Sequence, residues 1–289
     1  MVWHKKDDSM QDNGLLMLSQ MIYDHCGLKF MERQEILKEK ISRRMSELGI
    51  SHLEYGHRLK VMPGEWDTLI ELLTINETYF FREENQLIEC VSKVLPKLKE
   101  NNPNRPLKIW SAACSTGEEP FTLAMLMHES GKFQPGSVEI IGVDIDKKVL
   151  QKAEKAWYPS TSFSFRRIPQ NLLRKYFVTE NDGYQIIPAV KNMVKFQHLN
   201  LLDTNRVGQL GKFDVIFCRN VLIYFDRETI RQIIQSFHRN LLPGGYLFLG
   251  HAESITDMEL GFQKVDSEKT FYYRKETDID EKIQYIGSR

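Results

Sequence analysis

Several familiar features are missing from this 289-residue chain. Its four cysteines are far apart and form no Cys-x-x-Cys pair, so neither a zinc site nor a disulfide framework is expected. Acidic and basic residues balance at 39 each, so no net charge recruits nucleic acid or an anionic membrane. No apolar run is long enough to span a bilayer, and residues 1–14 lack the apolar core of a signal peptide. We therefore expect a cytoplasmic protein with no metal, no nucleic-acid partner and no segment inserted in a membrane.

The spacing of apolar residues changes near residue 100. Before that point the spacing is helical, as in Leu37, Ile41, Met45 and Leu48, and strand signals are scarce. Residues 101–106, NNPNRP, combine two prolines with three asparagines and are the predicted linker. We therefore predict a helical domain over 1–100, an α/β domain over 101–275 and a charged tail over 276–289.

Strands and helices alternate in the second domain, which predicts a mostly parallel sheet with helices on both faces. A final antiparallel pair, 262–265 with 271–273, would make the sheet mixed. A hairpin is expected over 183–190. The other strands are expected at 107–114, 138–144, 194–201, 213–219 and 246–250, and the helices at 118–130, 147–157, 170–177 and 228–241.

The turn over 111–119 carries one glycine, Gly117, where a dinucleotide-binding turn has three. Glu118 and Glu119 follow it, and carboxylates there would repel a pyrophosphate at the helix N-terminus. They would suit a ligand with a cationic end, such as an amino group or a sulfonium. The alternative is that both acids only favour the helix dipole, with Pro120 in the first turn.

Polar residues also end the next two strands. Asp146 is the expected N-cap of the helix that begins at Lys147. Asp144 lies closer to the strand end and is assigned to the hydroxyls of a ribose. Asn200 could contact an adenine edge, although a turn-forming asparagine is the simpler explanation.

Arg219 and Asn220 end the apolar strand FDVIFC, and Tyr224 follows them. A charged Arg219 at the tip of a buried strand needs a ligand or a partner, and an ion pair with Glu118 or Asp226 is the alternative. Tyr224 is either a site residue or an ordinary core tyrosine with its hydroxyl at the surface.

Residues 76–83, NETYFFRE, place an amide, a hydroxyl and Arg82 around two adjacent phenylalanines. Such a density of polar groups is typical of a functional site. The alternative is a segment that only packs Phe80 and Phe81 into a core.

Taken together, these segments resemble the CheR family, the chemotaxis receptor protein-glutamate O-methyltransferases that use S-adenosylmethionine. The resemblance covers about residues 15–275, and its most specific part combines STGEEP with FCRNVLIYF. It implies a class I S-adenosylmethionine-dependent methyltransferase (Rossmann-like) sheet, an N-terminal all-α domain, and a small β-subdomain inserted at about 158–192. The matching strings are NETYFFRE, IWSAACSTGEEP, VDID, NLLD, FDVIFCRNVLIYFD and LLPGGYLFLGHAES.

The resemblance also implies residue roles. Arg82 would position the acceptor carboxylate, and Tyr224 would lie near the sulfonium. S-adenosylhomocysteine would be the product. The residues that would bind the cofactor are Asn76, Thr78, Arg82, Glu118, Asp144, Asn200, Leu201, Arg219 and Asn220.

The implied partners are methyl-accepting chemotaxis receptors, met by a monomer. An expected helix over 31–48 places Arg33, Lys40, Arg43 and Arg44 on one arc, which could dock on an acidic receptor bundle or be a solvated face. In some family members the β-subdomain grips a tether peptide at the receptor C-terminus. The stretch WYPSTSFSFRRIP matches loosely there, so tether binding is left open.

Two other functions are compatible with these residues. One is methyl transfer by the same fold to another protein or to a small acid. The other is a non-catalytic module that binds S-adenosylmethionine for sensing.

Overall fold

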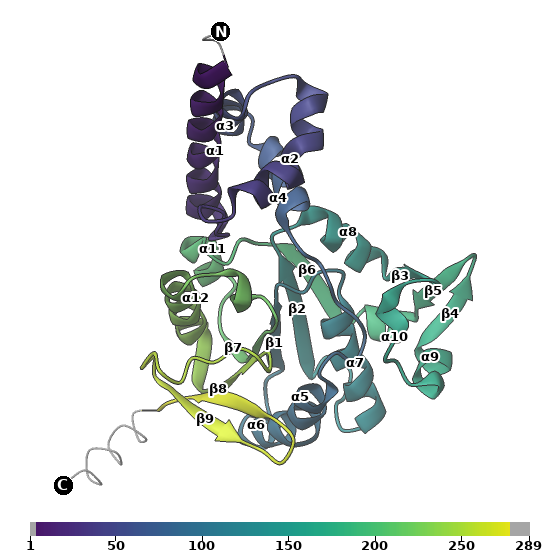
Figure 1. Ribbon diagram of the computed structural model, residues 1–289. Coiled ribbons are helices and arrows are strands. Elements are labelled where there is room, and N and C mark those ends of the chain that lie inside the picture. The colour runs from purple at the N-terminus through teal and green to yellow at the C-terminus, as the bar shows by residue number, and fades with distance from the viewer. Residues whose placement is uncertain (1–3, 278–289) are drawn as a thin grey trace, which may run out of the picture. The chain divides into compact units, whose positions relative to one another are not determined.

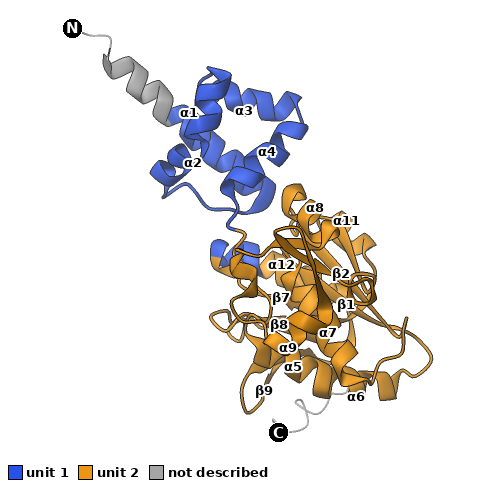
Figure 2. Ribbon diagram, turned by 90° about the vertical axis from the view of Figure 1, so that its right-hand side faces the viewer, with its two compact units in different colours: residues 1–75, 224–230 blue, residues 76–223, 231–289 orange. Residues whose placement is uncertain are grey.

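The computed structural model describes residues 4–277, with side chains described over 13–277. The chain forms two compact units (Figure 2). The first holds the residues up to Ile75 together with Tyr224–Ile230, and the second holds Asn76–Ile223 and the residues from Arg231 onward. The division lies earlier in the chain than the expected linker at 101–106, which is inside the second unit. Residues 278–289 of the expected tail lie outside the described residues.

The first unit is helical. Ser51 and Glu54 form a capping box that starts its third helix. The Tyr23 hydroxyl donates to Asp226 Oδ2 at 2.9 Å, so the late segment Tyr224–Ile230 is hydrogen-bonded to the first helix. Over residues 4–277 no helix has both the length and the apolar character that crossing a membrane requires. The four N-terminal helices are α1 (His4–Cys26), α2 (Gln34–Leu48), α3 (His52–Val61) and α4 (Gly64–Leu73).

The second unit is built on a mixed sheet. Its strands are β1 (Leu107–Ala112), β2 (Val138–Asp144), β6 (Val194–His198), β7 (Phe213–Cys218), β8 (Leu241–Leu249), β9 (Phe262–Asp266) and β10 (Phe271–Lys275). Their order is β6-β2-β1-β7-β8-β10-β9 (Figure 1). The first five are parallel, and β10 is antiparallel to both of its neighbours. The predicted mixed sheet with an antiparallel edge is confirmed.

Helices cover both faces of this sheet because successive side chains of a strand point to opposite faces. Ile109 joins a buried cluster with Phe121 of α7 (Glu118–Ser130). Its neighbour Trp110 packs instead against Phe237 of α12 (Arg227–Asn240), with ring centroids 5.0 Å apart. The predicted bounds of α7 and β2 match the structure. The other helices of the main sheet are α5 (Glu84–Glu89), the π-helical η1 (Cys90–Val94), α6 (Leu95–Asn101), α8 (Lys147–Lys155), α11 (Thr204–Gln209) and the 3₁₀ turn η3 (Leu222–Tyr224).

A second, antiparallel sheet occupies the region of the expected small β-subdomain. It has the order β3-β5-β4, with β3 (Trp157–Pro159), β4 (Phe177–Glu180) and β5 (Gly183–Ile186). Because Trp157 begins β3, helix α8 ends at Lys155, before its predicted end. Three short helices accompany this sheet: η2 (Phe163–Phe165), α9 (Gln170–Tyr176) and α10 (Pro188–Lys191).

The strand order reverses between β1 and β7, because the chain runs outward from β1 through β2 to β6 and then returns to β7. In open α/β sheets ligands bind at the carboxyl ends of the strands beside such a reversal. The predicted site residues at the ends of β1, β2, β6 and β7 therefore share one edge of the sheet.

Candidate functional site

The turn between β1 and α7 has an unusual backbone. Ala113, Ser115 and Gly117 all have positive φ, at 54°, 50° and 91°. A Cβ at Gly117 would lie 3.0 Å from Ala153 Cβ and 3.0 Å from Phe196 Cζ. Both the conformation and the space therefore require glycine there. The turn brings the start of α7 close to the ends of β1 and β2.

Asp144 lies buried at the end of β2. Its Oδ2 accepts a hydrogen bond from the Ser115 N–H at 2.8 Å, and its Oδ1 accepts one from the Asp146 N–H at 2.9 Å. Burial raises the pKa of Asp144 to about 6, against the effect of these donors. A carboxylate fixed in this way has lone pairs left for the hydroxyls of a sugar.

Asp146 is the N-cap of α8, as predicted, and accepts from the N–H groups of Lys148 and Val149. Its other oxygen, Oδ2, accepts from Asn76 Nδ2 at 2.9 Å. The Ser115 hydroxyl also donates to the Asn76 carbonyl at 3.1 Å. The NETYFFRE segment is thus attached to the ends of β1 and β2.

Glu118 begins α7 and is 1 % exposed. Among the described residues, its carboxylate accepts hydrogen bonds from Thr116 Oγ1 at 2.7 Å and from Ser164 Oγ at 2.7 Å. Burial raises the pKa of Glu118, against the opposite effect of these two hydroxyls and of the charge of Lys152. A ligand ammonium at this position would stabilise the ionised carboxylate.

A pocket of about 510 Å³ opens beside Glu118. Three segments line it: the NETYFFRE segment, the β1–α7 turn and the loop before α9. Three of the predicted site residues, Asn76, Thr78 and Glu118, are in its wall. The lining residues are Asn76, Glu77, Thr78, Thr116, Glu118, Thr161, Ser162, Phe163, Ser164 and Arg166.

Each of the two interpretations of the NETYFFRE segment, core packing and a functional site, applies to a different set of its residues. Phe80 is fully buried and packs on Phe165, Tyr158 and Phe177. Asn76, Glu77 and Thr78 instead line the pocket, and Phe81 takes a left-handed φ of 62°. The segment is therefore anchored by its phenylalanines and presents its polar groups.

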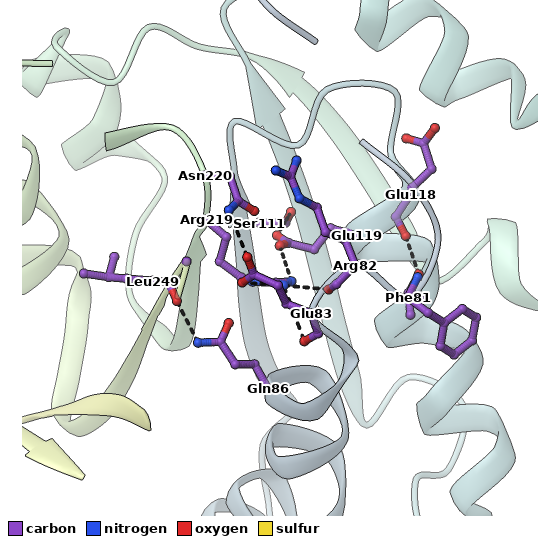
Figure 3. Close-up of polar contacts among 12 residues, drawn as sticks. Phe81, Arg82, Glu83, Gln86, Ser111, Glu118, Glu119, Arg219, Asn220 and Leu249 are labelled. Carbon is purple, nitrogen blue, oxygen red and sulfur yellow. Dashed lines mark hydrogen bonds and ion pairs between the residues drawn. The ribbon is translucent and has the colours of Figure 1, made fainter. Parts of the chain in front are cut away.

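Arg82 lies next to this pocket segment. Its Nη1 donates to the Glu77 carbonyl at 2.6 Å, and its guanidinium carbon is 5.7 Å from the centroid of the Tyr79 ring. Figure 3 shows the Arg82 guanidinium directed away from Arg219 and Glu83. The side chain is partly exposed, which leaves guanidinium donors for a ligand.

Arg219 does have the charged partners that its buried position predicts, but they are not Glu118 or Asp226. Its Nη1 binds Glu119 Oε2 at 2.9 Å, and its Nη2 binds Glu83 Oε2 at 3.2 Å (Figure 3). Nη2 also donates to the Arg82 carbonyl at 2.6 Å. Because α7 places Glu118 and Glu119 in different directions, only the second acid reaches Arg219. Arg219 holds the backbone of Arg82 and is not in the wall of the pocket.

Asn220 follows Arg219 with a left-handed φ of 58°. Its Nδ2 donates to Glu83 Oε1 at 3.0 Å, so the Glu83 carboxylate accepts hydrogen bonds from both Arg219 and Asn220. Its N–H donates to Glu253, a buried carboxylate that also accepts from the N–H groups of Gly250, Val221 and Leu222. Glu253 and Ser164 are structural partners of the site that the sequence did not identify. The only local signal for Glu253 is an acid that follows a glycine, and the only one for Ser164 is a serine in a polar stretch.

The residues predicted to face an adenine follow β6. Asn200 Oδ1 accepts from the Leu202 N–H at 3.0 Å, which is the turn-forming role, and Leu201 is buried. The Leu199 N–H donates to the Asp144 carbonyl at 2.9 Å, so this turn adjoins the end of β2. Tyr224 belongs to the first unit, and its position near the reacting atoms stays a prediction.

The expected basic stripe on the second helix is only partly correct. Helix α2 begins at Gln34, so Arg33 is its N-cap residue and precedes its first turn. Lys40 donates from Nζ to the carbonyls of Leu72 and Leu73 at the end of α4. Its charge therefore serves a helix C-terminus.

The two arginines of α2 differ in exposure. Arg44 makes a bidentate ion pair with buried Glu65, at 2.8 and 2.9 Å. Arg43 has a side chain that is 89 % exposed and pairs with Glu47 on the same helix. Arg43 is therefore the member of the stripe best placed to meet a partner.

Comparison with known proteins agrees with this arrangement. Residues 76–271 match the family described as CheR methyltransferase, SAM binding domain, and residues 14–74 match its all-alpha domain. Chemotaxis protein methyltransferase 2 of Vibrio cholerae is 40% identical over 220 residues, covering 75% of this chain and 76% of that protein. Chemotaxis protein methyltransferase 1 of Pseudomonas aeruginosa is 35% identical, covering 86% and 93%. The chemotaxis protein methyltransferase of Escherichia coli is 33% identical, covering 88% of both chains.

Proposed function

Because this chain belongs to the CheR methyltransferase family and is an S-adenosylmethionine-dependent methyltransferase, we propose that it methylates glutamate side chains of chemotaxis receptors. The products are γ-glutamyl methyl esters and S-adenosylhomocysteine. The acceptors are the cytoplasmic helical bundles of these receptors, and their methylation would tune adaptation. The names of three relatives as chemotaxis protein methyltransferases support this choice of acceptor.

Residues of the pocket and of the neighbouring strand ends fit the cofactor. Asp144 offers a fixed carboxylate for ribose hydroxyls, and Glu118 offers a buried carboxylate for the amino group of the methionine part. The two acids reach one turn, because Asp144 binds the N–H of Ser115 and Glu118 binds the hydroxyl of Thr116. This pair of buried carboxylates, both hydrogen-bonded to the β1–α7 turn, is the observation that carries the proposal. Asn200 and Leu201 would face the adenine from the neighbouring strand end.

When bound, the cofactor supplies an electrophilic methyl group on sulfur. The acceptor glutamate is already ionised at neutral pH, so the protein has no need of a strong general base. Its task is to orient the acceptor and to exclude water from it. Arg82 would hold the incoming carboxylate by charge-assisted hydrogen bonds, while Arg219 keeps the Arg82 backbone in place. Tyr224 would align the reacting groups.

The first unit would contribute to docking. Arg43, exposed on α2, could meet acidic side chains of a receptor bundle. A tether peptide at the receptor C-terminus would be met by the sheet β3-β5-β4. The protein would act as a cytoplasmic monomer.

The test is incubation with radiolabelled S-adenosylmethionine and a panel of receptor cytoplasmic domains. We expect label in base-labile esters on receptor glutamates. Labelling of a different protein or a small acid instead would show that the acceptor is wrong. Tight cofactor binding with no transfer to any acceptor would show a sensing module.

A further inference from the structure

One cation in the wall of the pocket has no role in the function proposed above. Arg166, at the end of η2, donates from Nη2 to Glu77 Oε1 at 2.7 Å. Its guanidinium carbon lies 3.8 Å from the centroid of the Tyr79 ring, on which Arg82 also approaches at 5.7 Å. Two guanidinium groups thus gather around one tyrosine next to the pocket.

The segment that carries Arg166 is fixed from inside. Ser164 is buried, donates to Glu118, and accepts from the Phe80 N–H at 3.0 Å through its carbonyl. Phe165 stacks on Phe80 with ring centroids 5.6 Å apart. The turn between these anchors leaves Phe163 79 % exposed at the pocket. Arg166 is therefore held in place by the turn while its own side chain remains accessible.

The ion pair of Arg166 is well placed to exchange. The Glu77 side chain is 63% exposed and that of Arg166 is 35% exposed, so water competes with this contact. Both residues line the pocket, whose wall also contains the buried acid Glu118. A ligand with one cationic and one anionic group would find an opposite charge for each.

We propose that Arg166 binds a ligand carboxylate in this pocket, and that Glu77 occupies the Arg166 guanidinium until that carboxylate replaces it. The inference rests on the function proposed above, because it concerns the same pocket. The carboxylate has two possible sources, the methionine part of the cofactor and the acceptor glutamate. A planar guanidinium group that stacks on a tyrosine ring can bind either carboxylate, since it presents parallel N–H donors.

The first arm measures the cofactor source by calorimetry, without any acceptor. Arg166→Ala should weaken the binding of S-adenosylhomocysteine by about tenfold or more, because a charge-assisted hydrogen bond is lost. The same variant should leave the affinity for the decarboxylated analogue of that ligand unchanged. Arg167→Ala is the matched control, because Arg167 is the next residue, is exposed, and is not in the wall of the pocket.

The second arm measures the acceptor source. If Arg166→Ala leaves cofactor affinity unchanged but raises the KM for the receptor domain about tenfold, the acceptor carboxylate is the ligand. Because the first arm needs no acceptor, a wrong receptor assignment would not obscure it. Arg166→Lys keeps the charge without the planar donors and should recover only part of either loss.

The decisive comparison is Glu77→Gln, which removes the competing carboxylate. Its effect should have the opposite sign to that of Arg166→Ala, with carboxylate-dependent binding tightened several-fold. If both variants weaken binding alike, or if neither alters binding in either arm, Arg166 and Glu77 form only a structural ion pair and the proposal is overturned.

Discussion

The Arg219 Nη2 atom donates to the backbone carbonyl of Arg82 at 2.6 Å. The end of β7 thereby fixes the residue that we expect to orient the acceptor. The contact is shielded from water, since the Arg219 side chain is 2% exposed. Glu119 keeps the arginine in position from the other side, and itself accepts from Ser111 Oγ at 2.7 Å.

Replacement of Arg219 should be costly. Arg219→Ala would leave the carboxylates of Glu83 and Glu119 without their cation, and we expect the free energy of unfolding to fall by roughly 3–5 kcal/mol. Urea denaturation measures this loss. Lys264→Ala, which removes an exposed pair with Asp266, is the control and should change stability little. A comparably small effect at Arg219 would contradict the structural role given to it.

Arg82→Ala should reduce turnover by about a hundredfold or more, because the acceptor carboxylate would no longer be oriented. The side chain is partly exposed, so the thermal unfolding temperature should hardly change. Steady-state kinetics with a receptor domain test this. Near-normal transfer by a folded variant would remove Arg82 from the mechanism.

Cofactor affinity should depend on pH through Asp144. The pKa of this carboxyl is raised from 3.8 to about 6 by burial, so the folded protein binds more protons than the unfolded chain between those values. This group's contribution to stability therefore falls as pH rises from about 4 to about 6. Cofactor affinity should rise over the same interval, because ribose hydroxyls favour the ionised carboxylate.

Asp144→Asn should weaken cofactor binding and reduce the pH dependence of that binding. Calorimetry of S-adenosylhomocysteine at pH 5 and pH 7, on both proteins, gives the comparison. An unchanged pH dependence in the variant would assign the titration to another group.

Two glycines offer a matched test of the β1–α7 turn. Gly117 and Gly211 have nearly equal φ values of 91° and 89°, so alanine meets similar backbone strain at either position. A Cβ at Gly117 would meet Ala153 and Phe196, whereas one at Gly211 has no heavy atom within 4 Å. Gly117→Ala should therefore destabilise by roughly 1–3 kcal/mol more than Gly211→Ala. Equal losses in chemical denaturation would show that the turn can relax.

Receptor docking is best tested at Arg43. Arg43→Glu should raise the KM for receptor domains while leaving stability unchanged, since that side chain is 89% exposed. Arg44→Glu is unsuitable for this purpose. The hydrogen bonds from Arg44 lower the pKa of Glu65 to about 2, and reversing the charge would place two acids together in the helical unit. Unchanged methylation by Arg43→Glu would exclude docking through this residue.

Local signals explain which elements could be predicted from the sequence. Gly117 before α7 and Asp146 before α8 mark helix starts through their own backbone and side chain, so those starts were predictable. The proline-rich segment 101–106 marks a turn, but only packing decides that α5 to α6 belong with the sheet. That packing could not be read from the sequence.

The candidate site was predictable only in part, for a similar reason. The carboxylates at the ends of β2 and at the start of α7 follow from strand and helix periodicity. The contact of Ser164 with Glu118, and the choice of Glu119 and Glu83 by Arg219, join residues far apart in the chain. Such pairings depend on the direction of each side chain in the folded protein, and no spacing rule supplies it.

The hydroxyl of Tyr23 on Asp226 has a consequence for the ancestry of such proteins. The helical unit draws its residues from two places in the chain. A recombination event that replaced only the N-terminal helices would therefore exchange Tyr23 and leave Asp226 unchanged. We expect the residues at these two positions to change together among descendants, as an inherited pair.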